Sequence, residues 1–205
     1  MSFAAFLIAA VVLAFTPGPG IAYVVARTVA GGRVEGLASC FGTAIGGMLH
    51  VVAAALGLSL LVAQSAVAFG LVKYIGAAYL VYLGLRLLLR KELDPEASPV
   101  ASQGTRRAFF EGVLVEALNV KTALFFLAFL PQFVSQAEPV ASQLVRLGSI
   151  CVGLNTLVDV LAVFGANRLL SSGAARAARA RLLTRSAGAT MVGLGAYLAL
   201  SKREA

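Results

Sequence analysis

Six apolar runs, each close to the length of a membrane-spanning helix, dominate this 205-residue sequence. A helix needs about 20 apolar residues to cross the hydrocarbon core of a bilayer. Apolar residues make up 60% of the chain and charged residues 13%, whereas soluble domains have about 45–50% and about 25%. We therefore predict an all-α polytopic membrane protein with six transmembrane helices. Their expected ranges are 3–26, 37–63, 67–89, 109–134, 143–166 and 186–201.

The positions of the cysteines and bases exclude two other classes of protein. Cys40 and Cys151 are the only thiols and each sits in an apolar run, which excludes a secreted disulfide scaffold. The net charge of +8 comes from bases at the ends of apolar runs, so we expect no nucleic-acid partner. No base precedes the run that starts at Phe3, so we expect this run to be retained and not cleaved as a signal peptide.

The distribution of Lys and Arg predicts the orientation of the chain in the membrane. The loops after the first, third and fifth runs hold 12 of the 17 bases, the opposite side holds 4, and Lys121 lies inside a run. Basic loops stay in the cytoplasm. We therefore expect a multi-pass protein of the bacterial inner membrane with both termini on the periplasmic side.

The two halves of the sequence share several aligned features. Lys73 stands three positions before Gly76-Ala in the third run, and Arg185 stands three positions before Gly188-Ala in the sixth. Halves with three spans each must be inverted, and inverted repeats with interrupted helices are typical of secondary transporters. We expect a single transmembrane domain over residues 1–205. Its parts are a first repeat at about 1–91, a polar linker at about 92–107 and a second repeat at about 108–205.

The first run contains a helix-breaking segment, Thr16-Pro-Gly-Pro-Gly20. Pro17 and Pro19 remove two backbone donors, and Gly18 adds flexibility between them. A membrane tolerates such a break only where the freed backbone groups are buried in protein or face water. We expect the Thr16 hydroxyl to bond an orphan carbonyl, and the half-helix starting near Gly20 to offer free N–H groups to a carboxylate. A purely structural kink is the alternative.

Three charged residues lie inside the apolar runs at similar depths. From the cytoplasmic ends of their helices, Glu116 lies about 9 Å, Asp159 about 10 Å and Lys121 about 16 Å deep. Charges inside a membrane are costly and mark functional sites. Asn119 and Asn155 would be their polar neighbours.

This layer of charge predicts a binding site for a zwitterion. Lys121 would take a carboxylate, and Asp159 or Glu116 an ammonium group. Either of these two acids is also a candidate for a coupling proton. The alternative is a structural salt bridge between Lys121 and one of the acids.

His50 is the single histidine and lies in the middle of the second run. It is a third candidate for proton coupling, with a helix-packing hydrogen bond as the alternative. Gly42, Gly46 and Gly47 in the same run, and Gly84 in the third, are typical of close helix packing. Such glycine faces also permit a homodimer.

The sequence lacks the motifs of metal, cofactor and enzyme chemistry. One histidine and two distant cysteines make no metal site of the usual spacing. No phosphate-binding loop, nucleophile elbow or HExxH motif occurs. We expect no metal, no cofactor and no enzymatic activity.

Four blocks of the sequence carry a resemblance to a known family. They are Phe15-Thr-Pro-Gly-Pro-Gly20, Gly32-Arg-Val-Glu-Gly36, Gly76-Ala-Ala-Tyr-Leu-Val-Tyr-Leu-Gly84 and Asn119-Val-Lys-Thr-Ala-Leu-Phe-Phe-Leu-Ala-Phe-Leu-Pro-Gln-Phe133. With these blocks the whole chain resembles the LysE-type amino-acid exporter superfamily, in particular its RhtB-like branch. The resemblance implies six spans in inverted halves. It also implies export of amino acids or relatives such as homoserine and its lactone, driven by the membrane potential or a proton gradient.

The resemblance also bears on the site residues and includes one departure. It implies site roles for residues 16–20, Asn119 and Lys121. The family usually has Asn-Pro-Lys in the fourth span, where this chain has Val120. We therefore expect the fourth span to be less sharply broken than the first.

These observations together predict a secondary transporter that works by alternating access between its halves. Its partners would be the lipid bilayer and a small amino-acid substrate of the homoserine, threonine, lysine or leucine type. One alternative is an exporter of an inorganic cation or other metabolite, which the shortage of His, Cys and acidic ligands argues against. Another is a non-transporting membrane scaffold that uses its buried charges for packing. A membrane-embedded enzyme comes third, because no catalytic constellation is visible.

Overall fold

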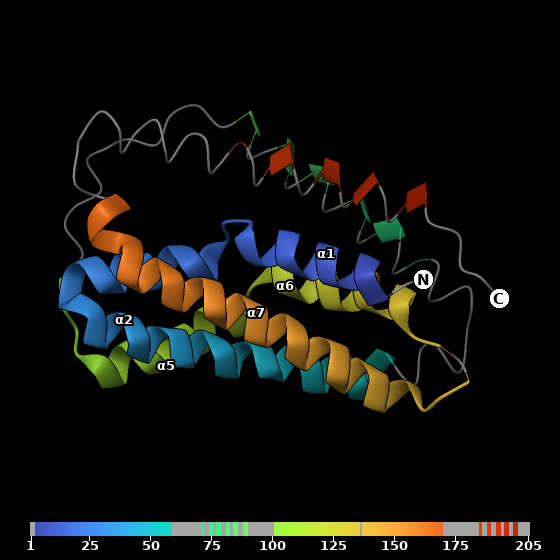
Figure 1. Cartoon of the computed structure of the whole chain (residues 1–205), viewed down its shortest axis with the longest axis horizontal. Helices are drawn as coiled ribbons and strands as arrows, with labels where there is room; N and C mark the ends of the chain where they lie inside the picture. Colours follow the sequence, from blue (N-terminus) through green and yellow to red (C-terminus); the bar gives the residue numbers. More distant parts are fainter. Residues whose placement is uncertain are drawn as a thin grey trace.

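The computed structural model describes residues 3–58, 101–135 and 137–169, with scattered positions between 71 and 89 and between 185 and 200. Every regular element in these ranges is helical, and Figure 1 shows the helices running along a common direction. Within the described residues, two helices are long and apolar enough to cross a membrane, or three if one bent pair counts as a single span. The predicted class, an all-helical membrane protein, is confirmed at this level.

The first predicted span is broken at its Pro-Gly segment. α1 covers Phe3–Phe15, and α2 begins at Pro19 with Gly18 as its N-cap. The 13 residues of α1 reach only about 20 Å, less than the hydrocarbon core of a bilayer. In Figure 1 the chain continues from α1 into the start of α2 along the bundle. The predicted interruption of this span is therefore confirmed.

α2, which covers Pro19–Ala53, turns back on itself at Gly32. Gly32 has a φ of 75°, a conformation that glycine adopts without steric cost. Thr28 and Gly36 would lie about 12 Å apart in a straight helix, yet a Cβ on Gly36 would collide with the Thr28 hydroxyl. Figure 1 shows the first arm of α2 and the returning second arm at one end of the bundle. The sequence Ala30-Gly-Gly-Arg33, which predicts a tight break between the first two spans, thus forms this turn, and η1 (Ala54–Leu58) continues the second arm.

The second half of the described chain forms another broken helix and one long helix. α5 covers Thr105–Ala117 and α6 covers Val120–Leu124, followed by η2 (Phe125–Phe129) and η3 (Leu130–Phe133). The axis bends by 42° between α5 and the segment that starts at α6. α7 covers Val140–Leu169. These helices coincide with the predicted spans 109–134 and 143–166, whereas most of the spans 67–89 and 186–201 lies outside the described residues.

The break in the fourth span persists although valine replaces the expected proline. Asn119 is the N-cap of α6, and its side chain accepts a hydrogen bond from the Lys121 backbone N–H at 3.1 Å. Val120 is then the first helical residue, whose N–H has no partner within the helix in any case. Because proline would remove a donor that the helix does not use there, its replacement leaves the break in place.

The glycines of the second span serve packing within the chain, as predicted. A Cβ on Gly46 would lie 2.6 Å from the Val113 carbonyl oxygen, and one on Gly42 would collide with α5. Gly47 faces Val152 of α7 at 3.0 Å. These glycines let the second arm of α2 lie close against α5 and α7.

Glycines also bring the described positions of the third and sixth predicted spans together. A Cβ on Gly84 would lie 2.6 Å from the Gly188 carbonyl oxygen, and one on Gly188 would lie 2.8 Å from that of Gly84. The prediction that Gly84 is a close-packing position is therefore confirmed. In Figure 1 these positions lie alongside each other at the edge of the bundle.

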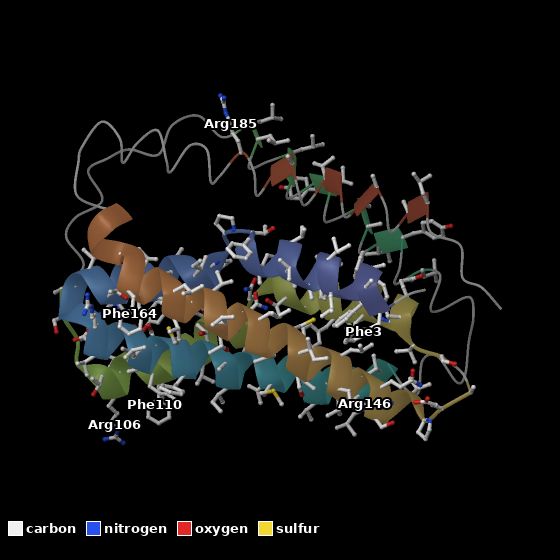
Figure 2. All side chains as sticks on the ribbon, viewed as in Figure 1. Phe3, Arg106, Phe110, Arg146, Phe164 and Arg185 are labelled. Atoms are coloured by element: carbon white, nitrogen blue, oxygen red, sulfur yellow. The ribbon has the colours of Figure 1, made fainter. Side chains whose placement is uncertain are left out.

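The bundle has an aromatic core and an apolar outer surface. Phe6, Phe125 and Phe129 are buried, while Phe110 is 59% exposed. Figure 2 shows Phe110 and Arg106 on α5 pointing away from the other helices. Apolar side chains exposed over the outer surface suit contact with lipid chains.

Glu35 ties the start of α5 to the hairpin of α2. One carboxylate oxygen of Glu35 accepts hydrogen bonds from the Ser102 hydroxyl and from the backbone N–H groups of Gln103 (3.2 Å) and Gly104 (2.8 Å). Arg27, on the first arm, donates to the Ala101 carbonyl at 3.3 Å. The chain before α5 is therefore fixed by two residues of α2, one on each side of its turn at Gly32.

We expect Glu35→Ala to lower the thermal midpoint of the purified protein in detergent by several degrees. The change removes the acceptor for two backbone N–H groups and the Ser102 hydroxyl, which leaves donors without partners. Glu138→Ala is the matched control, because Glu138 pairs with Arg146 on the surface and such pairs contribute little. Equal midpoints for the two variants would show that Glu35 does not hold this junction.

Candidate functional site

A partly open cavity lies where α1, α2, α5, α6 and α7 meet. Seven of the eleven predicted site and proton-coupling residues line it. They are Thr16, Gly20, Glu116, Asn119, Lys121, Asn155 and Asp159. The two helix breaks thus face one polar space.

Lys121 bridges the two breaks. Its Nζ donates hydrogen bonds to the carbonyl oxygens of Thr16 (2.9 Å) and Leu13 (3.3 Å) at the C-terminal end of α1. Its stem packs on Gly18, where a Cβ would lie 3.0 Å from Lys121 Cε. The ammonium group therefore bonds the Thr16 carbonyl and shares the Leu13 carbonyl with the Thr16 backbone N–H, at the negative end of the helix dipole. An ammonium group has three donors, so one stays available to the cavity.

The hydroxyl of Thr16 has the role that the sequence predicts. It donates to the Val12 carbonyl at 2.7 Å, one of the carbonyls orphaned by the break. Pro17 lies between α1 and α2, and Pro19 is the first residue of α2. Neither proline, nor Gly18, lines the cavity. Their contribution is the break itself and the space for Lys121.

The start of α2 borders the cavity and has backbone N–H groups without helical partners. Pro19 has no N–H, and the Ala22 N–H bonds to the Gly18 carbonyl at 3.1 Å. Gly20 and Ile21, the second and third helical residues, therefore carry N–H groups without a helical acceptor. Both residues line the cavity, so the positive end of a helix dipole faces it.

Glu116 is held by two side-chain donors. Its Oε1 accepts from the Thr122 hydroxyl at 2.6 Å, and its Oε2 accepts from Asn119 Nδ2 at 2.9 Å. The same Oε2 lies against Gly20, where a Cβ would come within 2.5 Å of it. Asn119 thus combines two functions, since it also caps α6.

The predicted alternative of a structural salt bridge at Lys121 is not found. In the described part of the chain, ion pairs join Arg107 to Glu111 and Arg146 to Glu138, and none joins Lys121 to an acid of the cavity. Lys121 is instead satisfied by carbonyls and Glu116 by an amide and a hydroxyl. The charges of the cavity are therefore present without being paired to one another.

Asp159 of α7 has a partner that the sequence did not indicate. Its Oδ2 accepts from the Thr43 hydroxyl at 3.1 Å, and both side chains are buried. Asn155 lies one turn earlier on α7 and lines the same cavity. Thr43 carries no anomaly in the sequence, because threonine is common in membrane helices. The one sequence feature that could have marked Thr43 is its position between Gly42 and Gly46, on the glycine-rich face of the second span.

His50 lies outside the cavity lining. Its Nε2 is 2.8 Å from the Glu116 carbonyl oxygen, at the C-terminal end of α5. Because a carbonyl only accepts, Nε2 is the protonated nitrogen. This is the helix-packing hydrogen bond that the sequence left open as the alternative to a proton relay.

Comparison with known proteins decides the family. The sequence profile of the LysE type translocator family matches residues 11–202. The chain belongs to this family. A membrane protein of Vibrio cholerae is 31% identical over 202 residues, which are 97% of this chain and 96% of that protein. The membrane protein YrhP of Bacillus subtilis is 32% identical, over 80% of this chain and 82% of its own.

Some similar proteins have a functional name. The homoserine/homoserine lactone efflux protein of Salmonella typhi is 28% identical over 154 residues, which are 75% of each chain. No solved structure matches the chain. The LysE resemblance read from the motifs is therefore confirmed, and the protein is a LysE translocator whose polar cavity lies at two helix breaks.

Proposed function

We propose that this LysE translocator is a secondary transporter that exports a small amino acid or close analogue across the bacterial inner membrane. The observation that carries the proposal is the cavity, which holds a buried cation and a buried carboxylate that are not paired to each other. Unpaired charges of opposite sign are expensive in a membrane. A zwitterionic ligand would compensate both of them at once.

The carboxylate of the substrate would bind between Lys121 and the start of α2. Lys121 has one donor left after its bonds to Leu13 and Thr16, and Gly20 and Ile21, whose N–H groups have no helical acceptor, line the same cavity. Helix N-termini and lysines are both suited to carboxylates. These groups come from both breaks, so binding would connect the two halves of the chain.

The ammonium group of the substrate would bind at Asp159. Both oxygens of Glu116 already accept hydrogen bonds from side chains, whereas the Thr43 hydroxyl reaches one oxygen of Asp159. Asp159 therefore has more capacity for a further donor. Asn155 and Thr156 on the same wall offer polar groups to a side chain such as that of homoserine.

The transport cycle would follow from the two halves of the chain. We propose six spans, with a first repeat at 1–91 and an inverted second repeat at 108–205, and both termini on the periplasmic side. α1 and α2 from one half and α5, α6 and α7 from the other line the cavity, which supports alternating access by movement of one half against the other. The proton gradient or membrane potential would drive export. The named efflux relative supports small polar amino acids and their lactones as substrates.

Export is tested with cells that overexpress the chain and are preloaded with amino acids through dipeptides. We expect faster release of particular amino acids, homoserine and threonine among the first to be assayed, than from cells with an empty vector. Protein in the membrane is quantified in parallel. Equal release of every amino acid by both strains, with the protein present in the membrane, would contradict the proposal.

In this assay, Gly20→Ala is expected to lower export at least tenfold. The new Cβ would lie 2.5 Å from Glu116 Oε2, and Glu116 is held in place by Asn119 and Thr122. The carboxylate would have to move into the cavity. Gly153→Ala is the matched control, because a Cβ at Gly153 meets nothing within 4 Å. Normal export by Gly20→Ala would show that the start of α2 is not part of the site.

A further inference from the structure

The hydroxyl of Thr43 has two acceptors within hydrogen-bonding distance. Its Oγ1 lies 2.9 Å from the Cys40 carbonyl oxygen and 3.1 Å from Asp159 Oδ2. All three residues are buried. A hydroxyl carries one hydrogen, so Thr43 can donate to only one of these oxygens at a time.

The two protonation states of Asp159 resolve this conflict in different ways. An ionised carboxylate only accepts, so Thr43 then donates to Asp159. A protonated Asp159 can donate to Thr43 Oγ1 instead, and the Thr43 hydrogen turns to the Cys40 carbonyl. Each state has a complete set of hydrogen bonds, and the change between them needs only rotation of one hydroxyl.

Glu116 has no such arrangement. Its Oε2 faces the Asn119 amide nitrogen, which can only donate. Its Oε1 faces the Thr122 hydroxyl, for which Glu116 is the one partner recorded in the described part of the chain. Protonation of either oxygen would leave a hydrogen without an acceptor among the described side chains. Of the two acids of the cavity, Asp159 is the one whose surroundings accept both states.

We propose that Thr43 is a positioning residue that allows Asp159 to exchange a proton during transport. The charged groups that face Asp159 are Glu116 from α5 and Lys121 from α6, while α2 supplies Thr43 and Cys40. Asp159 would take up a proton from water when the substrate ammonium leaves, and return it to water when the next ammonium binds. The proton and the ammonium group then compete for one carboxylate, which couples their movements. This inference rests on the proposed export function.

The first test is an infrared pH titration of the purified protein. The band of the protonated Asp159 carboxyl is identified by its loss in Asp159→Asn. Thr43→Val keeps the shape of the side chain without the hydroxyl, and Thr43→Ser keeps the hydroxyl. We expect the midpoint of the band to move by about one pH unit in Thr43→Val, the size expected for one hydrogen bond to a charged group. Thr43→Ser should keep the wild-type midpoint.

The second test is the pH profile of export by the same variants. In Thr43→Val the pH dependence of export should shift by the same number of pH units as the infrared midpoint. In Thr43→Ser it should remain as in the wild type. A merely structural role would lower export at every pH without moving the profile. Should Thr43→Val not reach the membrane, Thr43→Ala removes the same hydroxyl and is titrated in its place.

Three results would overturn the proposal. They are an unchanged midpoint in the variant without the hydroxyl, a moved midpoint with an unmoved export profile, and the absence of any Asp159 carboxyl band over the accessible pH range. A wild-type protein that exports no amino acid contradicts the proposed function instead. In that case the infrared titration, which needs no transport, still decides whether Thr43 positions the Asp159 proton.

Discussion

Lys121→Met is expected to reduce export to about one hundredth of the wild-type rate or less. Methionine retains the unbranched stem that packs on Gly18, but it cannot donate to the Leu13 and Thr16 carbonyls. It also removes the positive charge from the carboxylate end of the cavity. Loss of one charged partner in a buried hydrogen-bonded site costs about 2–5 kcal/mol, and about 1.4 kcal/mol corresponds to a tenfold change.

The control for this variant is Arg146→Met. Arg146 is exposed and pairs with Glu138 at the surface, so the same change of charge there should leave export near the wild-type rate. Amounts of both variants in the membrane are measured with the export rates. An export rate of Lys121→Met equal to that of the wild type would exclude Lys121 from the site. Failure of Lys121→Met to reach the membrane would support a role of Lys121 in packing alone.

Asp159→Asn is the second change with a large expected effect. Asparagine has nearly the same shape and still offers an oxygen to the Thr43 hydroxyl, but it carries no charge for the substrate ammonium. We expect export of zwitterionic amino acids to fall about 100-fold, by the same reasoning as for Lys121. The measurement is the initial rate of release over a range of internal concentrations, which separates weaker binding from slower turnover.

Glu138→Gln is the matched control for loss of one acidic charge. Glu138 lies on the exposed connection before α7, so its neutralisation should leave the export rate unchanged. Undiminished export by Asp159→Asn would remove both the ammonium site and the proton-exchange role from Asp159. The cavity would then need another acid, and Glu116 is the one that remains.

The Pro-Gly break of the first span and the turn at Gly32 could be predicted because both follow from the chemistry of single residues. Pro17 and Pro19 cannot supply backbone donors, and Gly32 has the φ that other residues avoid, so local sequence determines where the chain bends. The gathering of Glu116 and Asp159 was also predictable, because depth along a helix can be counted from its end.

The partners of the charged groups were not predictable in the same way. Depth along the helix does not give the rotation of one helix against another, and this rotation decides what a side chain meets. It sets Lys121 against the carbonyls of α1 and Asp159 beside Thr43. It also places His50 on the end of α5, outside the lining of the cavity. Conversely, the capping role of Asn119 follows from a known preference for asparagine before a helix and was available from the sequence.

The central claim is that the cavity binds a zwitterion through both of its charged ends. Equilibrium binding of radiolabelled homoserine to the purified protein tests it most directly, with competition by analogues that lack either the ammonium or the carboxylate group. We predict that the intact amino acid competes, and that each analogue competes at least tenfold less well, because each leaves Asp159 or Lys121 without its partner. Equal competition by the analogue without a carboxylate, or by the one without an ammonium group, would contradict the account.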